Sequence, residues 1–184
     1  ARHALLHECL AALRDATGGA LVIRRGDPAT VVPAVADEID ATTVFVSKDF
    51  GPHGRRRDAA VADTLRSAGR SLRGVGSPYA VEPGRVVKDD GTAYAVFTPF
   101  SKRWRAHGWD APVTAPRSPA WMVARTESLP DRPELPFDLP SAAEDVVLAR
   151  WRRFRDDRLA AYRDDRNLPA VPGSSHLSPF LKYG

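Results

Sequence analysis

The pattern of hydrophobic and polar positions changes period several times along the first 75 residues. Helical spacing predicts amphipathic helices at 3–16, 30–40 and 55–68. Short apolar, β-branched runs between them predict buried strands at 20–23, 43–47 and, more weakly, 71–75. This alternation is typical of the α/β class with a doubly wound, Rossmann-like parallel sheet. Such sheets usually have about five or six strands, so we expect one or two N-terminal strands to be missing.

Turn-forming and proline-rich sequence replaces this alternation further along the chain. Asp89–Gly91 predicts a tight turn, and a helix is expected from Pro99 to about Gly108. Ser141–Glu144 matches a capping box, which predicts a helix that continues through Tyr162. We therefore expect three parts: an N-terminally incomplete α/β domain at 1–109, an extended Pro-rich connector at 110–140, and the start of a truncated all-α domain at 141–184.

Composition places the chain among globular proteins. Of its 184 residues 43% are hydrophobic, and no apolar run is long enough to cross a membrane. A formal charge of +4 and a pI of about 9.6 are compatible with nucleic-acid binding but do not demonstrate it. The single cysteine, Cys9, excludes an intrachain disulfide and indicates a reducing, cytoplasmic compartment. Its place on the apolar face of a helix predicts core packing rather than chemistry.

Three further motifs have both a structural and a functional interpretation. Gly26–Pro28 stands between a predicted strand and a helix, where α/β sheets bind ligands, but a plain turn is favoured. Arg55–Asp58 opens a helix either as a phosphate contact or, more simply, as a solvated first turn. Trp104 and Trp109 suit stacking on a base or chromophore, but anchoring of the connector is favoured. The histidines lack metal-binding spacing and no nucleophile motif occurs, so we assign no metal site and no catalytic residue.

The last twelve residues, Gly173–Gly184, combine a hydroxyl-rich loop with a helix start. Ser178 suits the N-cap, and Pro179 suits the first helical position. Free backbone N–H groups at a helix start favour anions, and Ser174 and Ser175 add two hydroxyls beside them. The segment therefore predicts a phosphate-binding loop.

Four sequence elements occur in an order that resembles the DNA photolyase/cryptochrome family, specifically the bacterial cyclobutane pyrimidine dimer photolyases. They are Gly26–Pro28, Asp49–Asp58, Val96–Phe100 followed by Trp104, and Gly173–Gly184. The Phe-Thr-Pro-Phe sequence at 97–100 and the terminal segment are the specific elements, and the others support them. The resemblance implies an α/β antenna domain, a long connector and a helical FAD-binding domain, of which this chain would hold only the first helices.

The resemblance also implies which residues hold the flavin. In the family, a tyrosine and the hydroxyls of a Gly-Thr-Ser-x-Leu-Ser segment bind the FAD phosphates. The matching positions here are Tyr162, Ser174, Ser175, Leu177 and Ser178. Ser174 replaces the usual threonine and keeps its hydroxyl, whereas His176 stands where arginine is common and supplies less charge.

A second chromophore, the antenna, is implied by the same resemblance. Folate-type photolyases carry an Asn-Glu pair where this chain has His53 and Gly54. The Asp-x-x-Pro-x-Gly pattern from Asp49 to Gly54 is more similar to the deazaflavin-type antenna loop. The resemblance therefore favours 8-hydroxydeazaflavin over methenyltetrahydrofolate, with Asp49 and Gly54 as its contacts.

The implied function is that of a fragment of a light-dependent DNA repair lyase. The full-length enzyme would bind damaged DNA and split cyclobutane pyrimidine dimers by electron transfer from excited, reduced FAD, and the fragment alone would be inactive. Two alternatives stay open: a cryptochrome-type blue-light sensor without repair, and an unrelated nucleotide-binding α/β domain. We expect no membrane partner. We also expect the fragment to self-associate or to bind a chain that completes its fold.

Overall fold

The computed structural model describes residues 1–114, 116 and 118–183. Its contacts divide the chain into two compact units, one formed by Ala1–Ile23 with Arg125–Gly184 and the other by Arg24–Ala124. The domain boundaries expected from the sequence stay a prediction. Within the described ranges, no helix combines the length and the apolar character needed to cross a membrane.

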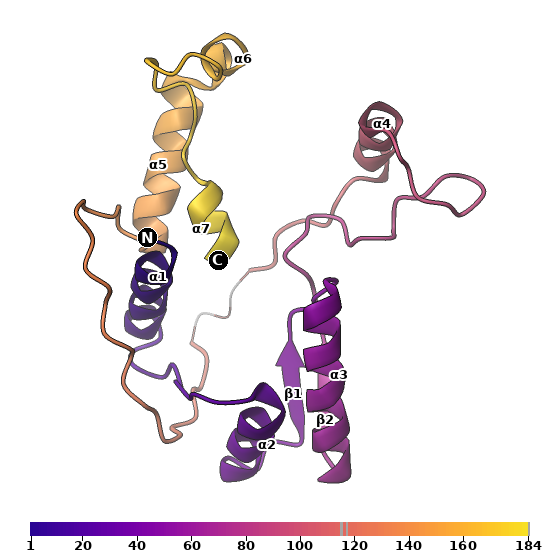
Figure 1. Ribbon diagram of the computed structural model, residues 1–184, viewed down its shortest axis with the longest axis vertical. Helices are drawn as coiled ribbons and strands as arrows, with labels where there is room; N and C mark the ends of the chain where they lie inside the picture. Colours follow the sequence, from indigo (N-terminus) through magenta and orange to yellow (C-terminus); the bar gives the residue numbers. More distant parts are fainter. Residues whose placement is uncertain (115, 117, 184) are drawn as a thin grey trace. The chain divides into compact units, whose positions relative to one another are not determined.

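The unit Arg24–Ala124 is built on two parallel strands, β1 (Thr43–Val46) and β2 (Ser71–Gly74). Two helices accompany them, α2 (Pro28–Glu38) and α3 (Pro52–Ser67). These helices pack against each other, and α3 also contacts β2 (Figure 1). Val46 lies opposite Gly74, so the carboxyl ends of both strands meet at one edge. The α/β class with a parallel sheet is thereby confirmed.

The core of this unit lies between the two helices and the strands. Ala36 of α2 and Val61 and Leu65 of α3 are buried together. Val44 and Leu72, one from each strand, pack against this cluster. The apolar positions that predicted these four elements are therefore the ones that hold them together.

The helices α2 and α3 both begin at a proline. Pro28 follows Asp27, whose carboxylate accepts the N–H of Ala29 at 2.9 Å and caps α2. Pro52 starts α3 three residues before the predicted boundary at 55. A proline in the first turn costs no helical hydrogen bond, because its missing N–H would have had no partner there.

The strand predicted at 20–23 is wrong. This segment has no strand pairing, and the sheet within the described residues has two strands. Its backbone instead meets a distant segment: the Ile23 N–H donates to Thr126 Oγ1, and the Ile23 carbonyl accepts the N–H of Glu127, both at 2.9 Å. A side-chain hydroxyl replaces one backbone acceptor, so no regular ladder forms.

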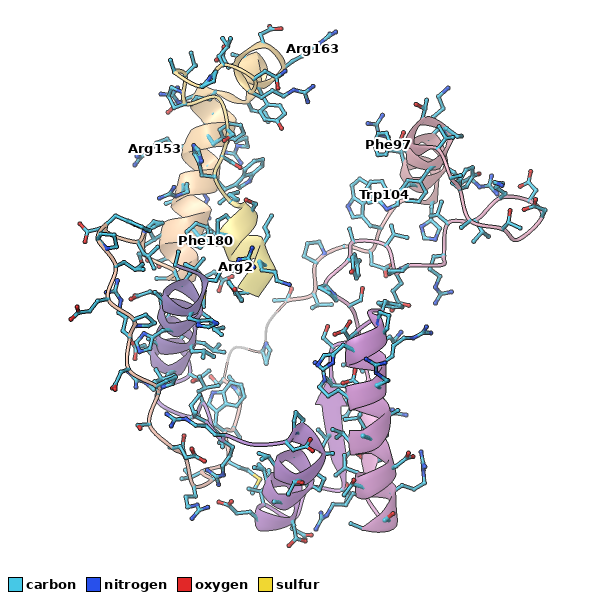
Figure 2. The ribbon with its side chains drawn as sticks, viewed as in Figure 1. Arg2, Phe97, Trp104, Arg153, Arg163 and Phe180 are labelled. Carbon is cyan, nitrogen blue, oxygen red and sulfur yellow. The ribbon has the colours of Figure 1, made fainter. Side chains whose placement is uncertain are left out.

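The helix α4 (Phe97–His107) starts two residues before the predicted Pro99. It follows the predicted turn at Asp89–Gly91, where the Gly91 N–H donates to the Lys88 carbonyl at 2.9 Å. Trp104, labelled in Figure 2, stacks on Trp109 with ring centroids 5.0 Å apart. The two indoles thus fix the chain where it leaves α4, as the structural interpretation of this pair predicted.

The other unit contains the helices α1 (Arg2–Ala16), α5 (Glu144–Asp157), α6 (Tyr162–Asp165) and α7 (Ser178–Tyr183), with the 3-10 turn η1 (Leu159–Ala161). The capping box predicted at Ser141–Glu144 is wrong, because Ala143 is the N-cap of α5 and makes no side-chain cap. The helix predicted through Tyr162 is interrupted at Arg158, whose φ of −135° is not helical. The short helix α7 begins at Ser178, one residue earlier than the predicted N-cap implies.

Candidate functional site

The terminal segment at 173–178 is held against α6 by a glycine. Gly173 is buried, and a Cβ at this position would lie 2.5 Å from the carbonyl carbon and oxygen of Asp165. Asp165 is the last residue of α6, which begins at Tyr162. The close approach of the two backbones requires glycine. This contact brings α6, which begins at the predicted Tyr162, next to the start of the predicted serine segment.

The three predicted serine hydroxyls have no hydrogen-bond partner in the part of the chain that the structure describes. Ser174 and Ser178 are exposed and Ser175 is half-buried. None of the three makes a hydrogen bond to another described residue. Between them, His176 has a left-handed backbone with φ of 53°, a conformation that residues other than glycine seldom adopt. A hydroxyl-bearing segment with unpaired donors fits a ligand that supplies oxygen acceptors, such as the phosphates of FAD.

Tyr162 lies in an aromatic and basic environment. Its ring packs edge-on against Phe154 with centroids 6.0 Å apart, and the Arg166 guanidinium lies 5.7 Å from the ring centre. Tyr162 is nevertheless 38% exposed. Leu177 is half-buried, and its carbonyl accepts the N–H groups of Phe180 and Leu181 at 3.0 Å. The helix α7, whose Phe180 is labelled in Figure 2, contacts α1 and anchors the segment from its other side.

A second candidate site lies at the carboxyl edge of the sheet. A cavity of about 380 Å³ is lined there by residues that end or follow the strands, including Val46, Lys48, Asp49, Phe50, Arg55 and Gly74. Open α/β sheets bind ligands at this edge. The cavity offers an aromatic ring together with two cations and two carboxylates, because Asp58 also lines it.

The structure brings Asp49 and Gly54 into direct contact. A Cβ on Gly54 would lie 2.0 Å from Asp49 Oδ2 and 2.6 Å from Asp49 Cβ, so the Asp49 side chain fills the space above this glycine. Asp49 Oδ1 also accepts the N–H of Gly51 at 2.9 Å, and Oδ2 lies 3.7 Å from the Arg57 guanidinium. Only Asp49 of the predicted pair lines the cavity. Its carboxylate is therefore already engaged by the protein.

One ion pair beside this cavity had no signal in the sequence. Lys48 Nζ donates to Glu82 Oε1 at 2.7 Å, across a separation of 34 residues. This hydrogen bond, helped by the charges of Lys48 and Arg85, lowers the pKa of the Glu82 carboxyl. The pair orients Lys48 at the cavity, and its two partners are too far apart in the chain to form a local motif.

Comparisons with known proteins identify the family of the chain. A sequence profile of the DNA photolyase family matches residues 1–120. The chain is 33% identical over 201 residues to a deoxyribodipyrimidine photo-lyase of Synechococcus sp. and 35% identical over 197 residues to one of Halobacterium salinarum. It is covered completely in both alignments and spans 42% and 41% of those proteins.

A solved structure extends the match from sequence to fold. The crystal structure of a bacterial class III photolyase from Agrobacterium tumefaciens superposes with a TM-score of 0.74 at 29% identity. The superposition covers 99% of this chain and 41% of that protein. Sequence and fold agree, and the chain belongs to the DNA photolyase family.

Proposed function

We propose that the full-length protein is a light-dependent DNA repair enzyme that splits cyclobutane pyrimidine dimers. The observation that carries this proposal is the match of the whole chain to proteins named deoxyribodipyrimidine photo-lyase. Because the chain spans less than half of these relatives, the activity and the damaged-DNA partner belong to the full-length protein. Membership of the photolyase family does not favour the alternative of an unrelated nucleotide-binding domain.

In this proposal the chain supplies one edge of the flavin phosphate site. If bound there in its reduced form, FAD would supply light-driven electron transfer, lending one electron to the dimer and taking it back once the cyclobutane ring has split. The free hydroxyls of Ser174, Ser175 and Ser178 donate to the phosphate oxygens, and Tyr162 adds a contact from α6. Half-buried Leu177 keeps the segment packed on the protein. These residues bind and orient, and none acts as an acid, base or nucleophile.

The cavity at the carboxyl edge of the sheet is the proposed antenna site. Phe50 supports an aromatic chromophore, and Arg55 can bind a polar or anionic group on it, whereas Lys48 is already bonded to Glu82. The loop pattern favours 8-hydroxydeazaflavin over methenyltetrahydrofolate. Asp49 lines the cavity, and Gly54 acts by leaving room for the Asp49 side chain.

A repair assay on the full-length protein tests the proposed function. Purified protein with reduced FAD is mixed with an oligonucleotide that carries one cyclobutane thymine dimer, with and without blue light. We expect intact thymines to appear only under illumination. A flavin-loaded protein that leaves the dimer intact would instead support the blue-light sensor, and a protein that cannot be loaded with FAD would contradict both.

The antenna is tested by identifying the chromophore directly. The full-length protein is reconstituted separately with 8-hydroxydeazaflavin and with methenyltetrahydrofolate, and retention is measured after gel filtration. We expect retention of the deazaflavin, weakened by Arg55→Ala but not by Arg66→Ala, a cation on the same helix outside the cavity. Retention of the folate alone would overturn the assignment.

A further inference from the structure

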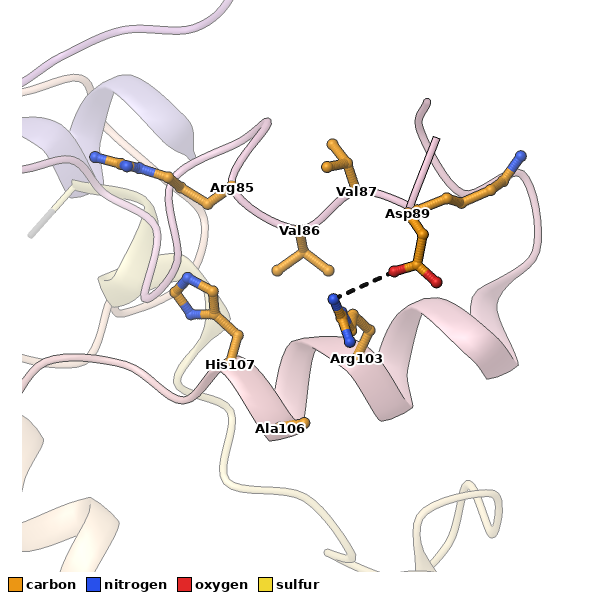
Figure 3. Close-up of a pocket in the computed structure, with 8 residues that line it drawn as sticks. Arg85, Val86, Val87, Asp89, Arg103, Ala106 and His107 are labelled. Atoms are coloured by element: carbon orange, nitrogen blue, oxygen red, sulfur yellow. Dashed lines mark ion pairs between the residues drawn. The ribbon is translucent and has the colours of Figure 1, made fainter. Parts of the chain in front are cut away.

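A separate pocket of about 510 Å³ lies between the segment 85–89 and α4, in the unit Arg24–Ala124. Figure 3 shows Val86 pointing from the segment toward the helix, with Arg103 and His107 rising from the helix toward the segment. Ala106 completes the apolar part of the lining. None of these residues belongs to the flavin or antenna assignments.

Positive charge dominates the lining of this pocket. Of the eight described residues that line it, four are of basic type, namely Arg85, Lys88, Arg103 and His107, and one, Asp89, is acidic. Asp89 faces Arg103 at 3.5 Å, but the two side chains are 98% and 58% exposed. An ion pair this exposed contributes little. The Arg103 guanidinium therefore stays available to an anion that binds it more strongly than Asp89 does.

The remaining basic groups are also weakly engaged. Arg85 approaches Glu82 only to 3.9 Å, and the shorter bond of Glu82 goes to Lys48. His107 Nδ1 donates to the Gly108 carbonyl oxygen at 2.7 Å, because a carbonyl oxygen only accepts. Within the described residues, the ion pairs of Arg85 and Arg103 are thus both long, and their guanidinium groups stay available to a ligand.

We propose that this pocket binds a small phosphorylated ligand. Arginine forks match phosphate oxygens in pairs, while Val86 and Ala106 offer apolar contact to the body of the ligand. The volume lies within the range of small-molecule sites, about 300–1,000 Å³. A concave pocket with three cations, Arg85, Lys88 and Arg103, suits a compact anion better than a nucleic-acid backbone, which is tracked by an extended basic surface.

Equilibrium dialysis of pyrophosphate against the FAD-loaded full-length protein tests this proposal. Loading with FAD fills the flavin phosphate site, so that the probe reports on other sites. We expect saturable binding that Arg103→Ala and Arg85→Ala each weaken about tenfold, the loss of a charge-assisted contact. Lys102→Ala is the matched control, because Lys102 is an exposed cation of α4 outside the pocket.

Three results would overturn the proposal. The first is no saturable binding at millimolar pyrophosphate. The second is an equal loss with Lys102→Ala, which would reveal a general charge effect. The third is tighter binding of an undamaged single-stranded oligonucleotide whose affinity rises with strand length and depends on Arg85 and Arg103, which would make the pocket part of a nucleic-acid surface.

Discussion

The two candidate sites are each shaped by a glycine, and what the glycine meets differs. Gly173 faces the backbone of Asp165, whereas Gly54 faces the side chain of Asp49. The polar groups differ as well: Asp49 is bonded within the protein, while the serine hydroxyls of the terminal segment have no partner among the described residues. The loop from Asp49 to Gly54 is thus held by its own contacts. The terminal segment is positioned by the contact of Gly173 with Asp165, while its hydroxyls make no hydrogen bond to the described part of the chain.

The largest expected effect is that of Gly173→Ala. The new Cβ would overlap the Asp165 carbonyl group, and a backbone cannot rotate away as a side chain can. We expect a loss of about 3 kcal/mol, the upper end for overpacking, measured by urea unfolding of the 184-residue chain. Ser174→Ala is the control and should change the free energy of unfolding by less than about 0.5 kcal/mol. Equal stability of the two variants would show that α6 and the segment do not touch.

Gly54→Ala should cost less, about 1–2 kcal/mol, because the Asp49 side chain is the obstacle. A double variant tests whether the Asp49 side chain causes this loss of stability. Removing the obstacle in Asp49→Ala/Gly54→Ala should recover part of the loss, a coupling visible in a double-mutant cycle of unfolding free energies. No recovery would mean that Asp49 does not occupy the space above Gly54.

Low pH should weaken the ion pair between Lys48 and Glu82. The pKa of Glu82 is lowered in the folded chain, below its ordinary value of 4.5. A depressed carboxyl pKa stabilises the fold above the unfolded value, and this contribution is lost as the pH falls through the folded value. We expect the melting temperature to fall less between pH 5 and about pH 3 in Glu82→Gln than in the wild type. Identical pH profiles would exclude the bond.

The smallest expected effect concerns Cys9. Partial burial, helped by the charge of Glu8, raises the pKa of its thiol. At pH 7 iodoacetamide should therefore alkylate Cys9 several-fold more slowly than free cysteine. Glu8→Gln removes only the smaller of the two causes of the raised pKa and should increase the alkylation rate slightly. Alkylation of the wild type as fast as free cysteine would contradict this account.

The sequence predicted the elements whose signal is local. The helices and strands from α2 to β2 were found from periodicity, since the same apolar positions build their common core. The apolar run at 20–23 carries the same signal, but its backbone partners lie about a hundred residues away at Thr126 and Glu127. An apolar run does not specify its partner segment, because that pairing is decided by the tertiary fold.

In the candidate sites, too, only the features with a local signal could be predicted from the sequence. The serine segment was predicted from its hydroxyls and from family resemblance, and the exposure of Ser174 and Ser178 agrees with a binding segment. Two contacts could not be predicted, namely that of Gly173 with Asp165 and the bond of Lys48 to Glu82. Each depends on the tertiary fold, which brings the two partners together.

The most direct test is a titration of FAD into the apo form of the full-length protein. The triple variant Ser174→Ala/Ser175→Ala/Ser178→Ala removes three donors, each of which contributes about 1.5–3 kcal/mol when it meets a charged acceptor. We predict a Kd at least about a hundredfold higher than that of the wild type, with an unchanged melting temperature of the apo form. The control Ser67→Ala/Ser101→Ala should leave the Kd unchanged. An unaltered Kd in the triple variant would contradict the assignment of this segment to the flavin phosphates.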